Sequence, residues 1–116
     1  MDYTEIDLDR PRKLKFGIAE LRDLQRRLGE QGVLQIAQRL RNLDLETVIL
    51  GYWVGLRRDD PKLTPDGVEA ILQGQLAAGR LLADFVGPLS DAIAWGAGLV
   101  RAEGNGQPQG KAPGTA

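Results

Sequence analysis

Three aspartates in the segment RRDDPKLTPDG, Asp59, Asp60 and Asp66, are the residues whose type and spacing come closest to a catalytic or metal site. Paired carboxylates can act as acid and base or bind a divalent cation. The spacing lacks the alternate-oxygen ladder and the closing glutamate of an EF-hand loop. Aspartate beside proline is typical of turns. We therefore interpret the three aspartates as turn residues and predict no metal site.

The chain contains no cysteine and no histidine. This excludes disulfides, thiolate nucleophiles, Ser-His or Cys-His pairs and the commonest zinc ligands. An enzyme would have to work with carboxylates, lysine or arginine alone. We predict a protein that is not an enzyme and that has no cofactor.

Two arginines and three aromatic residues remain as candidates for binding. Arg57 and Arg58 end a predicted helix, where exposed carbonyls favour positive charge, and the alternative is a contact with an acidic surface of a partner. Tyr52 and Trp53 fall on the apolar stripe of that helix, which predicts a place in the core. Trp95 falls off the apolar stripe of its own helix, so interface and core both stay open for it.

The length and the charge limit the possible functions. At 116 residues the chain fits one domain, and its net charge of −1 with only a mild split of charge lacks the concentrated basic face that nucleic acid requires. The longest apolar run, residues 92–100, is far shorter than the roughly 20 residues that span a bilayer. The acidic start MDYTEIDLD does not resemble a signal peptide. We expect a soluble cytoplasmic protein that binds neither nucleic acid nor membrane.

The first 16 residues predict a β-hairpin. Ile6 and Leu8 share one face of a first segment, Leu14 and Phe16 share a face of a second, and DRPR at 9–12 supplies the turn. An isolated two-stranded hairpin is marginal in water. Its apolar face must therefore pack on the helices or pair with the edge of another chain.

Apolar residues at helical spacing predict four to five helices after the hairpin. The first helix should end at Gly29, and Asp44 and Thr64 are expected N-caps of later helices. The expected stripes of the first three helices are Ile18, Leu21, Leu24 or Gln25, and Leu28; then Val33, Ile36, Ala37, Leu40 and Leu43; then Leu45, Val48, Ile49, Tyr52, Trp53 and Leu56.

The last part of the chain changes character twice. A fourth helix begins at Pro65, and its pattern allows either one helix or two up to an interruption at Gly87-Pro88, where we predict a last helix to begin. From residue 102 onward all residues are small, polar or proline, or charged, which predicts a disordered tail. The predicted fold is therefore mainly α: one small helical domain of four to five helices with an N-terminal β-hairpin, residues 1–101, and a disordered C-terminal tail, residues 102–116.

The second and third predicted helices, joined at RNLD, could also form a helix-turn-helix. The second helix of such a pair reads DNA with side chains near its start. Here the outward face at that point offers Glu46, Thr47, Leu50 and Gly51, with arginines only at the far end. A small helical DNA-binding regulator is the alternative function.

The segments RKLKFGIAELRDLQRRLGEQGV and YWVGLRRDDPKLTPDGVEAIL together resemble the small tail assembly chaperones of long-tailed phages and of phage-derived gene transfer agents. Members of that family have a strand-like "L+F" segment, here residues 14–16, and a helix of the "LxxLExxLG" type, here residues 21–29. A later "LxxGLRxxDPxLTxxxV" element is matched at Gly55, Leu56, Arg57, Asp60, Pro61, Leu63, Thr64 and Val68. The chain departs from the pattern at Gln25, at Tyr52 and in its glycine-rich last helix.

The resemblance implies a non-enzymatic role in the host cytoplasm. Such a protein binds the long helical tape measure protein, keeps it soluble, helps tail tube protein subunits polymerise around it, and leaves the finished particle. A hairpin edge and amphipathic helices can also support a homo-oligomer. The residues expected to contact partners are Ile6, Leu8, Leu14, Phe16, Arg57, Arg58 and Trp95.

Overall fold

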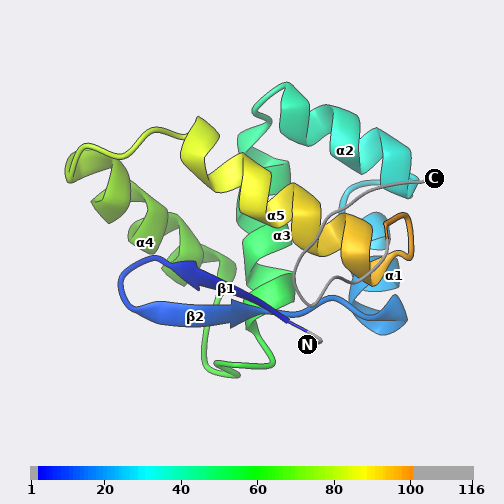
Figure 1. Cartoon of the computed structure of the whole chain (residues 1–116), viewed down its shortest axis with the longest axis horizontal. Coiled ribbons are helices and arrows are strands. Elements are labelled where there is room, and N and C mark those ends of the chain that lie inside the picture. The colour runs from blue at the N-terminus through cyan, green and yellow to red at the C-terminus, as the bar shows by residue number, and fades with distance from the viewer. Residues whose placement is uncertain (1–2, 101–116) are drawn as a thin grey trace.

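In the computed structural model of this chain, residues 3–100 form a β-hairpin and five helices (Figure 1). The elements are β1 (Thr4–Asp7), β2 (Pro11–Leu14), α1 (Ile18–Arg27), α2 (Val33–Arg41), α3 (Leu45–Leu56), α4 (Pro65–Ala77) and α5 (Ala83–Gly96). The mainly α fold with an N-terminal hairpin is therefore confirmed. The predicted disordered tail lies outside the described residues.

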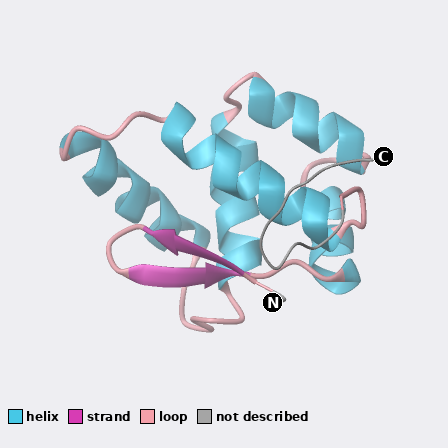
Figure 2. Ribbon diagram, viewed as in Figure 1, coloured by secondary structure: helices cyan, strands magenta, loops and turns pink. Residues whose placement is uncertain are grey.

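Helix α3 is the centre of the fold, and α1, α2, α4, α5 and β2 all contact it (Figures 1 and 2). Asp44 caps its start as predicted, because the side chain accepts a hydrogen bond from the Thr47 backbone N–H at 3.1 Å. Glycines let two neighbours come close. A Cβ on Gly51 would lie 2.9 Å from Leu89 of α5, and a Cβ on Gly55 would lie 2.7 Å from the Phe16 ring.

The hairpin closes one side of the core. Its strands are antiparallel with Thr4 opposite Leu14. The Lys15 backbone N–H, just past β2, donates to the Gly55 carbonyl at 2.8 Å, so the hairpin is hydrogen-bonded to the end of α3. At the other end, Arg80 donates to the Asp7 carbonyl at 2.7 Å. Of the two alternatives for the apolar face, packing on the helices of the same chain is the one observed.

The boundary between the last two helices differs from the prediction. Helix α4 ends at Ala77, and Gly79, with φ of 102°, lets the Arg80 N–H donate to the Gln75 carbonyl three residues before the cap. Helix α5 then begins at Ala83 and continues through Pro88, so the predicted interruption at Gly87-Pro88 is wrong.

Two features let α5 accommodate its proline. Pro88 has no N–H for the Asp84 carbonyl, but Asp84 is exposed and water can take that place. The next carbonyl, that of Phe85, accepts a hydrogen bond of 2.5 Å from the buried Tyr52 hydroxyl of α3. The helix is thus held by a side chain from its neighbour at the point where the proline weakens it.

Three residues of the predicted apolar stripes are exposed instead of buried. Ile18 and Leu45 are the first residues of α1 and α3, and their side chains are 68% and 57% exposed. Leu43 lies in the turn after α2 with φ of 59°, so its side chain leaves the helical face. Except for Ala37, which is partly buried, the remaining apolar residues of these three stripes pack in or against the core.

We expect Gly55→Ala and Gly96→Ala each to lower the free energy of unfolding by about 1–3 kcal/mol, because the new methyl group overlaps atoms of Phe16 in a packed region. Gly74→Ala is the matched control. It lies within α4 with no atom near the new Cβ, so it should raise stability by about 0.5–1 kcal/mol. Urea unfolding measures the free energy of unfolding of all three variants. Equal changes at the three glycines would contradict the close approach of Gly55 and Gly96 to Phe16.

We expect Tyr52→Phe to destabilise the protein by about 1–3 kcal/mol, because it leaves the buried Phe85 carbonyl without its hydroxyl donor. The edge-to-face ring contact with Phe85, 6.5 Å between centroids, would be kept. Tyr3→Phe is the control, since its hydroxyl makes no hydrogen bond within residues 3–100. Thermal and urea unfolding that ranked the two variants equally would count against a role for the Tyr52 hydroxyl.

Candidate functional site

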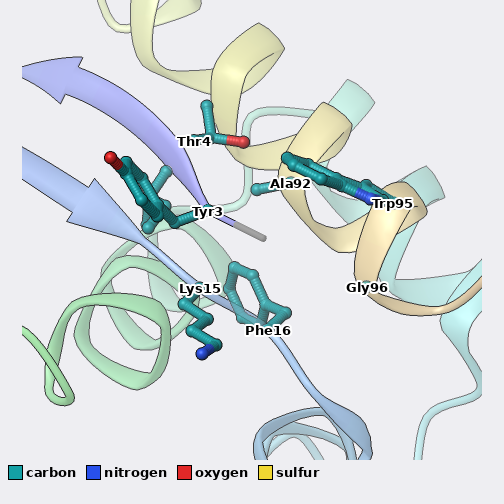
Figure 3. A pocket seen from close by; sticks show the side chains of 8 residues that line it. Tyr3, Thr4, Lys15, Phe16, Ala92, Trp95 and Gly96 are labelled. Carbon is teal, nitrogen blue, oxygen red and sulfur yellow. The ribbon is translucent and has the colours of Figure 1, made fainter. Parts of the chain in front are cut away.

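A pocket of about 240 Å³ lies between the hairpin and the last turns of α5 (Figure 3). Tyr3 and Trp95 line it from opposite sides, one from the start of the hairpin and the other from α5. The complete lining is Tyr3, Thr4, Leu14, Lys15, Phe16, Ala92, Trp95 and Gly96. Polar and apolar atoms contribute about equally to its surface, and the polar residues among the lining are Tyr3, Thr4 and Lys15.

The pocket exists because the hairpin meets α5 at a glycine. A Cβ on Gly96 would lie 2.4 Å from the Phe16 carbonyl oxygen, so only glycine lets the helix reach the strand end there. Phe16 and Leu14 are at most 7% exposed and form the fixed floor. On the rim, the Lys13 amine lies 4.9 Å from the centre of the Tyr3 ring, which favours a defined ring position.

The structure brings three of the predicted contact residues together and separates the others. Leu14, Phe16 and Trp95 line this one pocket, although they are far apart in the sequence. Ile6 and Leu8 are each 7% exposed and belong to the core of this chain. A partner could therefore reach Trp95 and the pocket, whereas the side chains of Ile6 and Leu8 offer it almost no surface.

Arg57 joins α3 to α1. It donates to the Asp23 carboxylate at 2.7 Å, and Arg27 donates to the same oxygen at 3.0 Å. Both guanidinium groups also lie over the Trp53 ring, 4.6 Å away for Arg27 and 5.1 Å for Arg57. Trp53, predicted for the core, is partly buried and donates its indole N–H to the Leu63 carbonyl at 2.9 Å.

Two of the other predicted charges, Arg58 and Asp60, also form ion pairs. Arg58 pairs with Glu20 of α1 at 2.9 Å, and that glutamate also accepts the Gly17 N–H that precedes the helix. Asp60 pairs with Arg12 at 3.2 Å, which ties the loop after α3 to β2. The sequence pattern did not point to Arg12, which is only 5% exposed and which also pairs with Asp9.

These pairs account for the charged loop that resembled a metal site. Asp60 neutralises arginines of the hairpin and accepts the Lys62 N–H, and Asp66 lies in the first turn of α4 where negative charge is favoured. Within residues 3–100 no three acidic side chains are grouped so that they could hold a metal ion. The arrangement is that of a turn between two helices.

The geometry of α3 does not suit a DNA-reading helix. Of its residues only Leu45 and Glu46, at the first turn, are exposed, and five other elements cover the rest. A recognition helix must present one face to the major groove.

The helices of residues 3–100 also bear on whether this part of the chain crosses a membrane. None of these helices combines the length and the apolar character that a bilayer span requires.

No family model matches this chain, and comparisons with curated proteins and with solved structures also return no match. The site must therefore be interpreted from its own residues.

We expect the ion pairs of Asp23 to make the free energy of unfolding depend on pH in the acid range. Burial alone raises the pKa of Asp23, but the hydrogen bonds and charges of Arg57 and Arg27 outweigh it, and the pKa lies below its usual 3.8. A carboxyl group whose pKa is lowered by folding stabilises the protein above its unfolded pKa, and this contribution disappears as the pH falls through the folded pKa. Asp23→Asn should cost on the order of 1 kcal/mol at pH 7, and the cost should shrink as the pH falls below the usual carboxyl pKa and through the lowered pKa of Asp23.

Urea unfolding of Asp23→Asn, Arg57→Gln and the double variant, at neutral and at acid pH, tests this expectation. The two single changes should be clearly non-additive at pH 7, because they remove the same contact. Additive losses, or a loss for Asp23→Asn that is unchanged in acid, would show that the pair does not contribute.

Proposed function

We propose that this chain is a non-enzymatic tail assembly chaperone that binds a tape measure protein and assists polymerisation of tail tube protein subunits in the host cytoplasm. The observation that carries the proposal is the aromatic pocket between the hairpin and α5. The pocket offers the aromatic rings of Tyr3 and Trp95 beside the polar residues Thr4 and Lys15, which suits the capture of a side chain of a partner protein.

The size and lining of the pocket favour a protein partner. Pockets that hold drug-sized ligands are commonly about 300–1,000 Å³, whereas this one is about 240 Å³ and suits a single large side chain. Amphipathic helices bind other proteins by placing such apolar anchors in grooves. Trp95 and Tyr3 provide rigid aromatic walls, which are typical of binding hot spots. A long helical tape measure protein would offer many anchors of this kind.

The two segments that carry the family resemblance depend on each other physically. Leu14 and Phe16, from the first segment, pack on Gly55 of the second. Asp23 of the first pairs with Arg57 of the second. These contacts support reading the two segments as one structural element rather than as unrelated helices and turns.

The charged groups favour binding over catalysis as well. Arg12, Asp60, Glu20 and Asp23 are held in ion pairs within the chain, where they join the hairpin, the loop after α3 and the helices. Because cysteine and histidine are absent from the sequence, neither a thiolate nucleophile nor an imidazole base is available. The exposed groups are therefore suited to recognising a partner through apolar and electrostatic contacts.

The test is co-expression with the longest helical protein encoded beside this chain. We expect the soluble fraction of that protein to rise and the two to copurify, because the chaperone covers apolar stripes that otherwise aggregate. Trp95→Ala and Tyr3→Ala should each reduce copurification at least about tenfold, as expected for a hot-spot aromatic worth 1.4 kcal/mol or more.

Leu34→Ala is the matched control, because Leu34 is a large apolar residue on α2 that is 72% exposed and does not line the pocket. It should leave copurification unchanged, and circular dichroism should show that all three variants keep their helices. The proposal is wrong if the parent chain neither solubilises nor retains the helical protein. Equal losses for Leu34→Ala and Trp95→Ala would place the binding surface elsewhere.

A further inference from the structure

Four arginines gather on the face formed by α1 and the end of α3. Asp23 lies at the centre of this arginine cluster, which consists of Arg26, Arg27, Arg57 and Arg58. Arg26, Arg27 and Arg57 share the Asp23 carboxylate, and Arg58 pairs with Glu20 one turn earlier on α1. Four guanidinium groups thus share two carboxylates, which leaves two positive charges in excess.

The cluster is both exposed and held in place. The side chains of Arg26 and Arg58 are 57% and 53% exposed, whereas Asp23 and Glu20 beneath them are 19% and 7% exposed. Arg27 and Arg57 are fixed by Asp23 and by stacking on Trp53. Guanidinium groups that are already ordered lose little conformational entropy when they bind another carboxylate.

The same chain carries a complementary surface on α4. Asp66 and Glu69 are three residues apart, and therefore on one helical face, and both are exposed. Within residues 3–100 neither carboxylate takes part in an ion pair or a side-chain hydrogen bond. Helix α4 packs on α3 and leaves this face open, at the other side of α3 from α1 in Figure 1. We refer to these two residues as the acidic face of α4.

We propose that the arginine cluster of one copy binds the acidic face of α4 in a second copy. The excess of two positive charges on one surface matches two unpaired carboxylates on the other. Nucleic acid is the less suitable occupant, because four arginines interleaved with carboxylates do not form the extended basic face that a phosphate backbone requires. The two surfaces differ, so the contact is head-to-tail and can repeat along a row of copies. This inference does not depend on the proposed function.

Sedimentation velocity over a range of concentrations up to about 1 mM, at low and high salt, tests the contact. The Debye length is about 30 Å in 0.01 M salt and about 3 Å in 1 M salt. We expect concentration-dependent association at low salt and its loss at high salt. Charge reversal by Arg26→Glu or by Glu69→Lys should each weaken association at least about fivefold. Both side chains are exposed, so the fold should survive the change.

Mixing Arg26→Glu with Glu69→Lys tests whether the arginine cluster and the acidic face of α4 bind each other. Each variant keeps one intact surface, so an equimolar mixture should associate more strongly, as heterodimers, than either variant does alone. Arg41→Glu is the control, because Arg41 is exposed at the end of α2, belongs to neither surface and gives the same change of net charge as Arg26→Glu; it should associate like the parent. A parent chain that stays monomeric at low salt would overturn the proposal. Association that persists at high salt, or low-salt retention of DNA or RNA that Arg26→Glu abolishes, would overturn it too.

Discussion

The contact of Phe16 with two glycines is the constraint on which the rest of the structure depends. Gly55 of α3 and Gly96 of α5 both lie where any side chain would overlap Phe16. The adjoining Lys15 N–H donates to the Gly55 carbonyl, which lies in the last turn of α3, where helix carbonyls lack partners within the helix. The hairpin therefore does two things at once: it fills the space between two helices, and it completes the end of the central one.

The surface chemistry follows from that junction. The aromatic pocket is the outer side of the place where Phe16, Ala92 and Gly96 meet, so its floor is as rigid as the core. The ion pairs of Asp23 and Asp60 lie around the same end of α3 and fasten α1 and the hairpin to it. The pocket and the arginine cluster are thus both positioned by the end of α3 but consist of different residues. One small domain therefore has two surfaces that can bind partners independently.

Local signals in the sequence were sufficient for much of the fold. The caps at Asp44 and Thr64 and the stop at Gly29 depend on residues a few positions away, and the structure has all three. The passage of α5 through Pro88 was not predictable, since it relies on the Tyr52 hydroxyl from another helix. The candidate site was predicted only in part. Leu14, Phe16 and Trp95 were singled out separately, but only the three-dimensional packing brings them together beside Tyr3, which no periodic pattern marks.

The dependence of Phe16 on Gly96 also bears on how the chain is made. During synthesis the hairpin leaves the ribosome before α5, because Gly96, one of the two glycines that Phe16 packs against, is synthesised 80 residues later. A two-stranded hairpin without a surface to pack on is marginally stable in water. The hairpin therefore gains its full packing only after α5 has been synthesised, although α3 can cover part of its apolar face earlier.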